Sequence, residues 1–218
     1  MVALVRRVPL VVPLLILPSW PSYLLMNRDD EATDHILFYY IPDLVEAPLR
    51  IIPNVLVTPF VNTEGDQILL VTGLLLMFGI TVERRLGFGA AFAIFWGASA
   101  VAALVGGALW HVIYPDVTTV EPVERGGERI FNGGSAGGFA LLAAAAATMR
   151  RPWILLLAFF IWEPIFWANI SRDYTSVFHV IAVATGFVMA RHYFIPRARR
   201  RHEASTAGQA EPGEPPET

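Results

Sequence analysis

The chain has 218 residues, of which 55% are apolar and only 16% are charged, with a formal net charge of −3 and a mean hydropathy of +0.51. Soluble domains carry about a quarter charged residues, so this composition indicates a protein embedded in lipid and argues against a disordered chain or a nucleic-acid binder. The absence of cysteine excludes a disulfide framework, a thiolate nucleophile and a cysteine metal site. The 16 residues counted as Lys or Arg are all arginine, which excludes mechanisms that need a catalytic lysine.

Six apolar stretches approach the roughly 20 residues that a helix needs to cross a bilayer. They predict an all-α membrane protein with a domain over residues 1–196 and six transmembrane helices, at about residues 8–26, 67–82, 86–110, 130–149, 152–170 and 174–190. The first stretch contains four prolines, and we interpret it as a kinked spanning helix, with a signal peptide as the alternative. Residues 197–218 are rich in Arg, Glu, Pro, Gly and Ala and predict a disordered cytoplasmic tail.

The distribution of charge indicates the orientation. An even number of spans leaves both termini on one side, and the segments on that side contain 11 of the 16 arginines. The connections on the other side contain 13 of the 19 acidic residues. Because basic residues that flank spans stay preferentially in the cytoplasm, both termini are predicted to be cytoplasmic. The lysine-free composition with acids outside points to a prokaryotic cell membrane.

The connection between the first two predicted spans, residues 27–66, is long. It contains two apolar runs, 36–41 and 51–60, that are too short to cross a bilayer. The acidic residues Asp43 and Glu46 lie between them. We therefore expect an element that lies partly in the membrane interface.

Two polar residues lie at matched depth within predicted spans, where polar groups are costly and usually functional. Ser135 lies near the outer start of the fourth span, and His179 lies near the outer start of the sixth. Small residues at helical spacing follow both and allow the helices to approach closely: Ala136, Ala140 and Ala144 on one, Ala182, Gly186 and Ala190 on the other. Close packing would bring hydroxyl and imidazole within hydrogen-bond distance, which is the minimal arrangement for a serine activated by a histidine base.

Structural interpretations of the same residues remain open. A serine in a Gly- and Ala-rich membrane helix is commonly a packing residue, and an intramembrane histidine can serve as a proton relay. Glu163 precedes Pro164 in the fifth span, and we favour a structural role in which its carboxylate satisfies backbone donors freed by a proline kink. His111, beside Trp110 at the outer end of the third span, is interpreted as an interfacial anchor.

The order of these motifs resembles that of the rhomboid intramembrane serine proteases, over roughly residues 8–194. The rhomboid nucleophile motif, Gly-x-Ser-Gly followed by small residues, is similar to the run Gly133–Leu142. The last core span of rhomboids has a histidine with a glycine seven positions later, which is similar to the run His179–Gly186. The second-span signature of a glycine turn, an acid, basic residues and Leu-Gly is similar to Met77–Gly87, and the third span is similar at Trp96–Ala102.

The resemblance implies a six-helix rhomboid-like bundle that hydrolyses peptide bonds of membrane-anchored proteins. It implies Ser135 as the nucleophile and His179 as the general base and acid, and a Ser–His dyad suffices in this family. Gly133 and Gly134 would shape the cleft, while the Ser135 backbone N–H and the Gln67 side chain would hold the oxyanion. The expected partners are transmembrane segments of protein substrates and the lipid bilayer, with no nucleic acid, metal or cofactor.

Two departures from the rhomboid pattern bear on activity. The second span of rhomboids carries His-x-x-x-Asn, whose side chains help to bind the oxyanion, and these positions fall here on Gln67 and Val71. In addition, alanine follows the nucleophile where rhomboids have glycine. Losing one oxyanion donor typically slows an enzyme about 10²- to 10³-fold, unless Thr72, Asn132 or Asn62 substitutes.

These departures leave two alternative functions open. One is a catalytically inactive rhomboid-like pseudoprotease that binds transmembrane segments without cutting them. The other is a small proton-linked carrier that uses Glu163 and His179, although the sequence contains no internal repeat of the kind that carriers show. By the rhomboid resemblance, the fifth span with Glu163 and Pro164 would form part of a lateral gate for the substrate.

Overall fold

The computed structural model describes residues 9–26, 39–60, 62, 65–115, 121, 130–131 and 133–207. Several predictions fall on residues outside these ranges: Val8, the start of the apolar run 36–41, Asn132 and the tail beyond Ala207. Within the described ranges the chain is all-α apart from one pair of two-residue strands, as the composition predicts.

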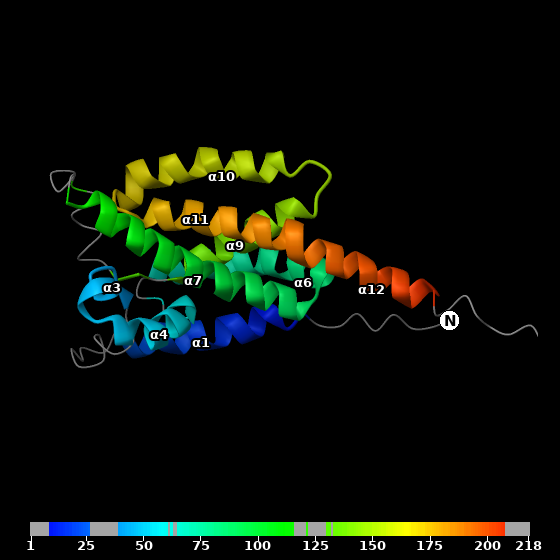
Figure 1. Ribbon diagram of the computed structural model, residues 1–218, viewed down its shortest axis with the longest axis horizontal. Coiled ribbons are helices and arrows are strands. Elements are labelled where there is room, and N and C mark those ends of the chain that lie inside the picture. The colour runs from blue at the N-terminus through cyan, green and yellow to red at the C-terminus, as the bar shows by residue number, and fades with distance from the viewer. Residues whose placement is uncertain are drawn as a thin grey trace, which may run out of the picture.

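The helices assemble into one elongated bundle (Figure 1). In chain order they are α1 (Val11–Met26), α3 (Asp43–Glu46), α4 (Pro48–Val57), the 3₁₀ turn η1 (Thr58–Phe60), α5 (Gly65–Leu74), the π-helical η2 (Leu75–Gly79), α6 (Ile80–Leu86), α7 (Phe88–Ile113), α9 (Gly133–Ala147), α10 (Trp153–Phe166), the π-helical η3 (Trp167–Ser171), α11 (Thr175–Val188), the π-helical η4 (Met189–Phe194) and α12 (Ile195–Ala207). The segments α5 to α6 and α11 to α12 are each one continuous helix, so the second and sixth stretches are longer than predicted. Gly87, with φ of 95°, separates α6 from α7.

Helix α9 is the centre of the bundle, and all 15 of its residues are buried. It packs against α5, α7 and α11. Its Gly- and Ala-rich sequence allows this burial because neighbouring backbones can come close. A Cβ at Gly137 would lie 2.6 Å from the Phe95 ring of α7, and a Cβ at Gly186 of α11 would lie 2.7 Å from Ala140 Cα. The predicted close packing of the fourth and sixth stretches is therefore confirmed.

A short antiparallel strand pair precedes α9 and corrects the predicted start of the fourth span. Strand β1 (Tyr39–Tyr40) pairs with β2 (Ile130–Phe131), so residues 130–131 are not helical and the helix covers only Gly133–Ala147. The aromatic and β-branched residues favour an extended backbone, and helix begins only at the glycines that follow. Burial, with a smaller contribution from Asp43, raises the pKa of Tyr39, whose hydroxyl donates to the Ala103 carbonyl oxygen on α7.

The long connection before α5 contains the two helices α3 and α4, which lie beside one end of α7 (Figure 1). Several of their apolar side chains point outward, with Leu49 88%, Ile52 68% and Val45 67% exposed. These exposed apolar residues on short helices support the predicted interfacial element, since a soluble surface would not favour them. His111 at the end of α7 reaches back to this element, and its Nε2 lies 3.0 Å from the Ile41 carbonyl oxygen. The imidazole therefore ties α7 to the connection, in addition to its edge contact with Trp110.

The C-terminal segment corrects another prediction, because residues 197–207 are helical in α12 rather than disordered. Arginine, alanine and glutamate are good helix formers, and the sequence has no glycine between Pro196 and Gly208 to interrupt the helix that arrives from α11. Four arginines of this segment are exposed along the part of α12 that extends beyond the bundle: Arg197, Arg199, Arg200 and Arg201.

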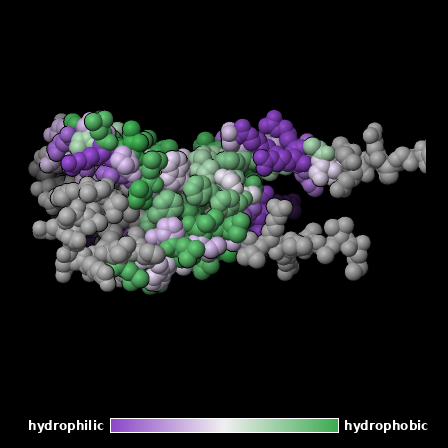
Figure 2. Space-filling view, turned by 90° about the horizontal axis from the view of Figure 1, so that it is seen from below, coloured by the Kyte–Doolittle hydropathy of each residue, from purple (hydrophilic) through white to green (hydrophobic). Residues whose placement is uncertain are grey.

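The outer surface and the helix lengths together indicate a multi-pass membrane protein. Three described helices are long and apolar enough to cross a bilayer: Gly65–Leu86, Phe88–Ile113 and Thr175–Thr206. Figure 2 shows hydrophobic side chains over the middle of the molecule and a hydrophilic cluster where α12 extends from it. This distribution of hydrophobic side chains indicates that the middle of the molecule faces lipid, because soluble monomers do not expose apolar surface on this scale.

Candidate active site

Ser135 is the third residue of α9, a helix that starts on the side of the bundle away from α12 (Figure 1). The start of α9 is held by Ser99 of α7, whose hydroxyl donates to the Gly133 carbonyl oxygen at 2.8 Å and to the Phe95 carbonyl oxygen at 2.9 Å. The first N–H groups of a helix have no partner within the helix, so the Ser135 N–H belongs to the set that a ligand can use. Ser135 thus lies in the first turn of a helix whose start is held to α7.

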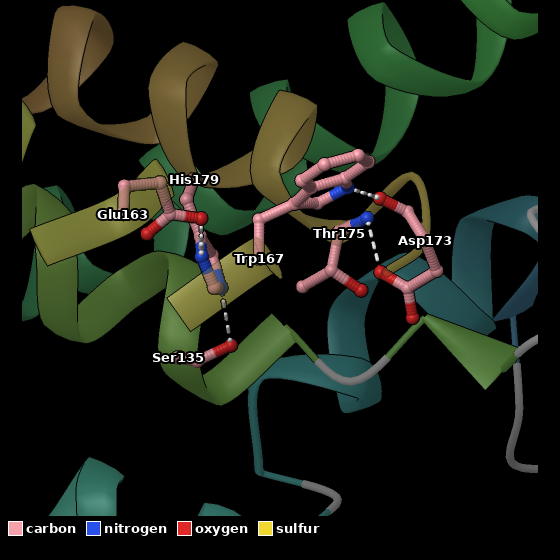
Figure 3. Close-up of polar contacts among 6 residues, drawn as sticks. All are labelled: Ser135, Glu163, Trp167, Asp173, Thr175 and His179. Atoms are coloured by element: carbon pink, nitrogen blue, oxygen red, sulfur yellow. Dashed lines mark hydrogen bonds and ion pairs between the residues drawn. The ribbon is translucent and has the colours of Figure 1, made fainter. Parts of the chain in front are cut away.

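His179 is the fifth residue of α11, which starts at the same end of the bundle as α9. Its Nε2 lies 3.0 Å from Ser135 Oγ (Figure 3). The contact that matched depth and small-residue spacing predict between these residues is present. Phe139 of α9 packs against the imidazole with ring centroids 4.6 Å apart, which limits how far the ring can move.

Glu163 of α10 completes a chain of contacts, because its Oε1 lies 2.8 Å from His179 Nδ1 (Figure 3). The favoured interpretation, in which this carboxylate serves backbone donors freed by Pro164, is therefore wrong. The lone acid and the lone base of the apolar stretches pair with each other, as intramembrane ionisable residues usually do. That tendency was the sequence signal for the contact, although sequence alone did not reveal which face of α10 meets α11.

The turn between α10 and α11 fixes the distance between Glu163 and His179. Arg172 adopts a left-handed conformation with φ of 44° and reverses the chain after η3. Asp173 then joins the two helices, since its carbonyl oxygen accepts from Trp167 Nε1 at 3.0 Å and its carboxylate accepts from the Thr175 N–H at 2.8 Å (Figure 3). These bonds hold the end of the helix that carries Glu163 to the start of the one that carries His179.

The glycines before the nucleophile lie against the second predicted span. A Cβ at Gly134 would lie 3.1 Å from Asn62 Oδ1, 3.2 Å from the Pro59 carbonyl oxygen and 3.3 Å from Val71 Cγ2. Val71 therefore lies at the site, as the register with His-x-x-x-Asn predicts. Gln67 is half-buried one turn earlier on the same face of α5, and its role as an oxyanion donor stays a prediction.

Asn62 has the side chain best placed to supply a missing donor. It is 0% exposed, and within the described ranges neither its Nδ2 nor its Oδ1 has a hydrogen-bond partner. A buried amide without partners is costly, so Asn62 is a candidate hydrogen-bond donor at the site. Of the other proposed substitutes, Thr72 is half-buried on α5 and Asn132 lies outside the described residues.

The three side chains of the site are buried. Ser135 is 6% exposed, Glu163 4% and His179 1%. The Phe139 ring lies beside the imidazole, and Phe159 and Trp162 pack against Phe139. In the part of the chain that the structure describes, no group of three or more His, Asp and Glu side chains is arranged to hold a metal ion. The arrangement therefore places the Ser135 hydroxyl, the His179 imidazole and the Glu163 carboxyl group in one chain of contacts.

No protein-family model, curated protein or solved structure matches the chain. The resemblance to rhomboids therefore rests on the sequence motifs alone, and the chemistry of the site rests on the contacts of Ser135, His179 and Glu163.

Proposed function

We propose that this chain is a rhomboid-like intramembrane serine endopeptidase that cuts membrane-anchored proteins. The observation that carries the proposal is the 3.0 Å contact between Ser135 Oγ and His179 Nε2. A hydroxyl and an imidazole in such contact, at the start of a buried helix, have the parts that acyl transfer needs. A pure packing role does not explain why an imidazole is kept at the serine in an apolar interior, where unneeded polar groups are costly.

The reaction follows from the order of these atoms. Ser135 Oγ attacks the substrate carbonyl carbon, the C=O π electrons move to its oxygen, and the Oγ proton passes to His179 Nε2. The C–N bond then breaks as the imidazolium returns this proton to the leaving amine. Water, which His179 deprotonates in turn, attacks the acyl carbon, and the proton is returned to Ser135 Oγ as the acid product leaves.

The oxyanion of this reaction would form beside Gly133 and Gly134. The Ser135 backbone N–H is one donor, and a side-chain amide from the α5 side, Gln67 or Asn62, is the other. Glycine at position 134 lets Asn62, Pro59 and Val71 approach the start of α9, because a Cβ there would lie only 3.1 to 3.3 Å from their atoms.

Substrate and water need an opening, and α10 is the helix best suited to provide it. Of its 14 residues, only Phe159 and Glu163 are buried. Leu155, Leu156 and Trp162 are partly buried against the bundle, whereas Phe160 and Ile161 face outward and are more than half exposed. A helix attached through so narrow a face can move with little loss of packing, which supports a lateral gate at this side of the bundle.

The proposal is tested by cleavage of a transmembrane substrate in liposomes by the purified full chain. Ser135→Ala and His179→Ala are expected to abolish cleavage, whereas Ser19→Ala is expected to keep it. Ser19 is a matched control, since it is also buried and its hydroxyl donates to the Leu15 carbonyl oxygen of its own helix. A fluorophosphonate probe should label the wild type and Ser19→Ala but not Ser135→Ala.

A wild-type protein that neither cleaves nor reacts with the probe would overturn the proposal. Retained binding of transmembrane segments would then assign the chain as a pseudoprotease. Proton flux into liposomes that depends on Glu163 and His179 would instead assign it as a proton-linked carrier.

A further inference from the structure

The buried carboxylate of Glu163 calls for a physical explanation. Glu163 is 4% exposed and lies on α10, a helix otherwise made almost wholly of apolar residues. Burying such a group is costly unless it is paired and hydrogen-bonded. The contacts of Glu163 therefore indicate its role.

The carboxylate has one hydrogen-bond partner among the described residues, and that partner is the imidazole. Oε1 lies 2.8 Å from His179 Nδ1, while Oε2 is buried without a partner. Pro164 directly follows Glu163 and lacks an N–H, and the backbone beyond it changes to the π-helical η3. The carboxylate nevertheless turns to the imidazole on the next helix rather than to its own backbone.

The chemistry of the two partners indicates which tautomer of His179 satisfies both contacts. An ionised carboxylate can only accept, so the proton of the neutral imidazole lies on Nδ1 and is donated to Glu163. Nε2 then presents a lone pair to Ser135, whose hydroxyl donates to it at 3.0 Å. This is the tautomer in which His179 can take the serine proton.

We propose that Glu163 is a positioning residue that converts the Ser135–His179 dyad into a triad, an inference that rests on the proposed endopeptidase function. It holds the imidazole in one tautomer and orientation, and its charge stabilises the imidazolium that forms when Ser135 attacks. Glu163 accepts a hydrogen bond throughout and takes up no proton itself. Because His179 and Glu163 are both buried, a charge on the carboxylate acts strongly on the imidazolium beside it.

The competing explanation is that the Glu163–His179 contact only ties α10 to the bundle. The two roles differ in what they require at position 163. A tie needs any hydrogen-bonding group, which glutamine provides with nearly the same shape. A positioning residue needs a charged acceptor, because a glutamine amide group can turn its N–H₂ toward Nδ1 and force the imidazole into the wrong tautomer.

The experiment compares Glu163→Gln, Glu163→Asp and Glu163→Ala in the full chain, with the exposed Glu203→Gln of α12 as control. We expect Glu163→Gln to lower kcat about 10²- to 10⁴-fold with KM little changed, since replacing the analogous carboxylate by its amide in a soluble serine protease costs about 10⁴-fold. Glu163→Asp should recover at least part of this loss. Thermal unfolding should show Glu163→Gln as stable as the wild type.

A second readout does not depend on turnover. In protein labelled with ¹⁵N-histidine, the His179 Nδ1–H should give a strongly downfield proton signal, assigned by its loss in His179→Ala. The signal should persist in Glu163→Asp and Glu203→Gln and be lost or shifted in Glu163→Gln. Absence of the signal in the wild type would overturn the proposal, whatever the activity.

The outcomes separate the two proposals. An active wild type with an equally active Glu163→Gln variant would overturn the positioning role and leave the endopeptidase function standing. An inactive wild type that still shows the downfield signal would overturn the endopeptidase function and the positioning role with it, and would leave the pair as a contact of the fold.

Discussion

At the scale of single residues, the proposed reaction needs an amide that binds its oxyanion, and two side chains are candidates. The pattern of rhomboids directs attention to Gln67, one turn before Val71 on α5. The packing around Gly134 instead favours Asn62, whose Oδ1 would lie 3.1 Å from a Cβ at that glycine. The two amides differ in environment, because Asn62 is wholly buried with no hydrogen-bond partner among the described residues, whereas Gln67 is half-buried.

We predict that Asn62→Ala lowers kcat about 10²- to 10³-fold, the usual cost of one oxyanion donor, with little effect on KM. Gln67→Ala should have the smaller effect, because a half-buried amide is partly satisfied by its surroundings. Kinetics on one transmembrane substrate, with Asn62→Asp as a variant of similar shape that lacks the amide donors, measure the difference. A larger loss for Gln67→Ala would assign the donor to the position that the sequence motif indicates.

Ser135 and Glu163 show what sequence can and cannot predict about such a site. The Ser135–His179 contact is predictable because small residues at four-residue spacing leave two membrane helices few ways to pack. The Glu163–His179 contact was missed because Pro164 offered a local explanation for the acid, and the turn at Arg172 that brings α10 back onto α11 has no distinct sequence signal. When apolar stretches contain one acidic and one basic residue, the first interpretation should be that the two side chains pair with each other.

At the scale of elements, the site depends on how closely α9 and α11 pack. A Cβ at Gly186 would lie 2.7 Å from Ala140 Cα and 2.8 Å from its carbonyl carbon, so even alanine cannot fit without a backbone shift. His179 lies two turns before Gly186 on the same face of α11. The distance between the helices therefore sets the distance between Ser135 and His179.

We predict that Gly186→Ala separates the two helices, destabilises the protein by about 1–3 kcal/mol and lowers cleavage on the order of 10²-fold. Gly73→Ala in α5 is the matched control, because a Cβ there would meet nothing within 4 Å. Thermal unfolding and fluorophosphonate labelling of both variants test this. Equal behaviour of the two variants would show that the α9–α11 contact is more adaptable than the backbone distances indicate.

At the scale of the whole molecule, the question is how many helices cross the bilayer. Helix α9 has 15 residues, a length of about 22 Å, which is less than the roughly 30 Å of a hydrocarbon core. A helix that faces lipid would have to be longer, but every residue of α9 is buried among other helices. Its length is therefore set by the protein around it, and a short central helix is compatible with the six spans that the sequence predicts.

The six-span topology makes a prediction that the chain's lack of cysteine renders simple to test. Single cysteines should alternate in their reactivity toward a membrane-impermeant thiol reagent applied to intact cells. Cysteines that replace Glu46, Glu121 and Arg172 are expected to be labelled in intact cells. Cysteines that replace Arg84, Arg151 and Arg201 are expected to be labelled only after permeabilisation, because the arginine-rich segments stay in the cytoplasm. The exposed Arg201 reports the side of α12, and Arg172 reports the end of the bundle at which α11 begins. If Arg172→Cys were protected and Arg151→Cys labelled, the Ser135–His179 end would face the cytoplasm, and the substrate bond would have to be sought on that side.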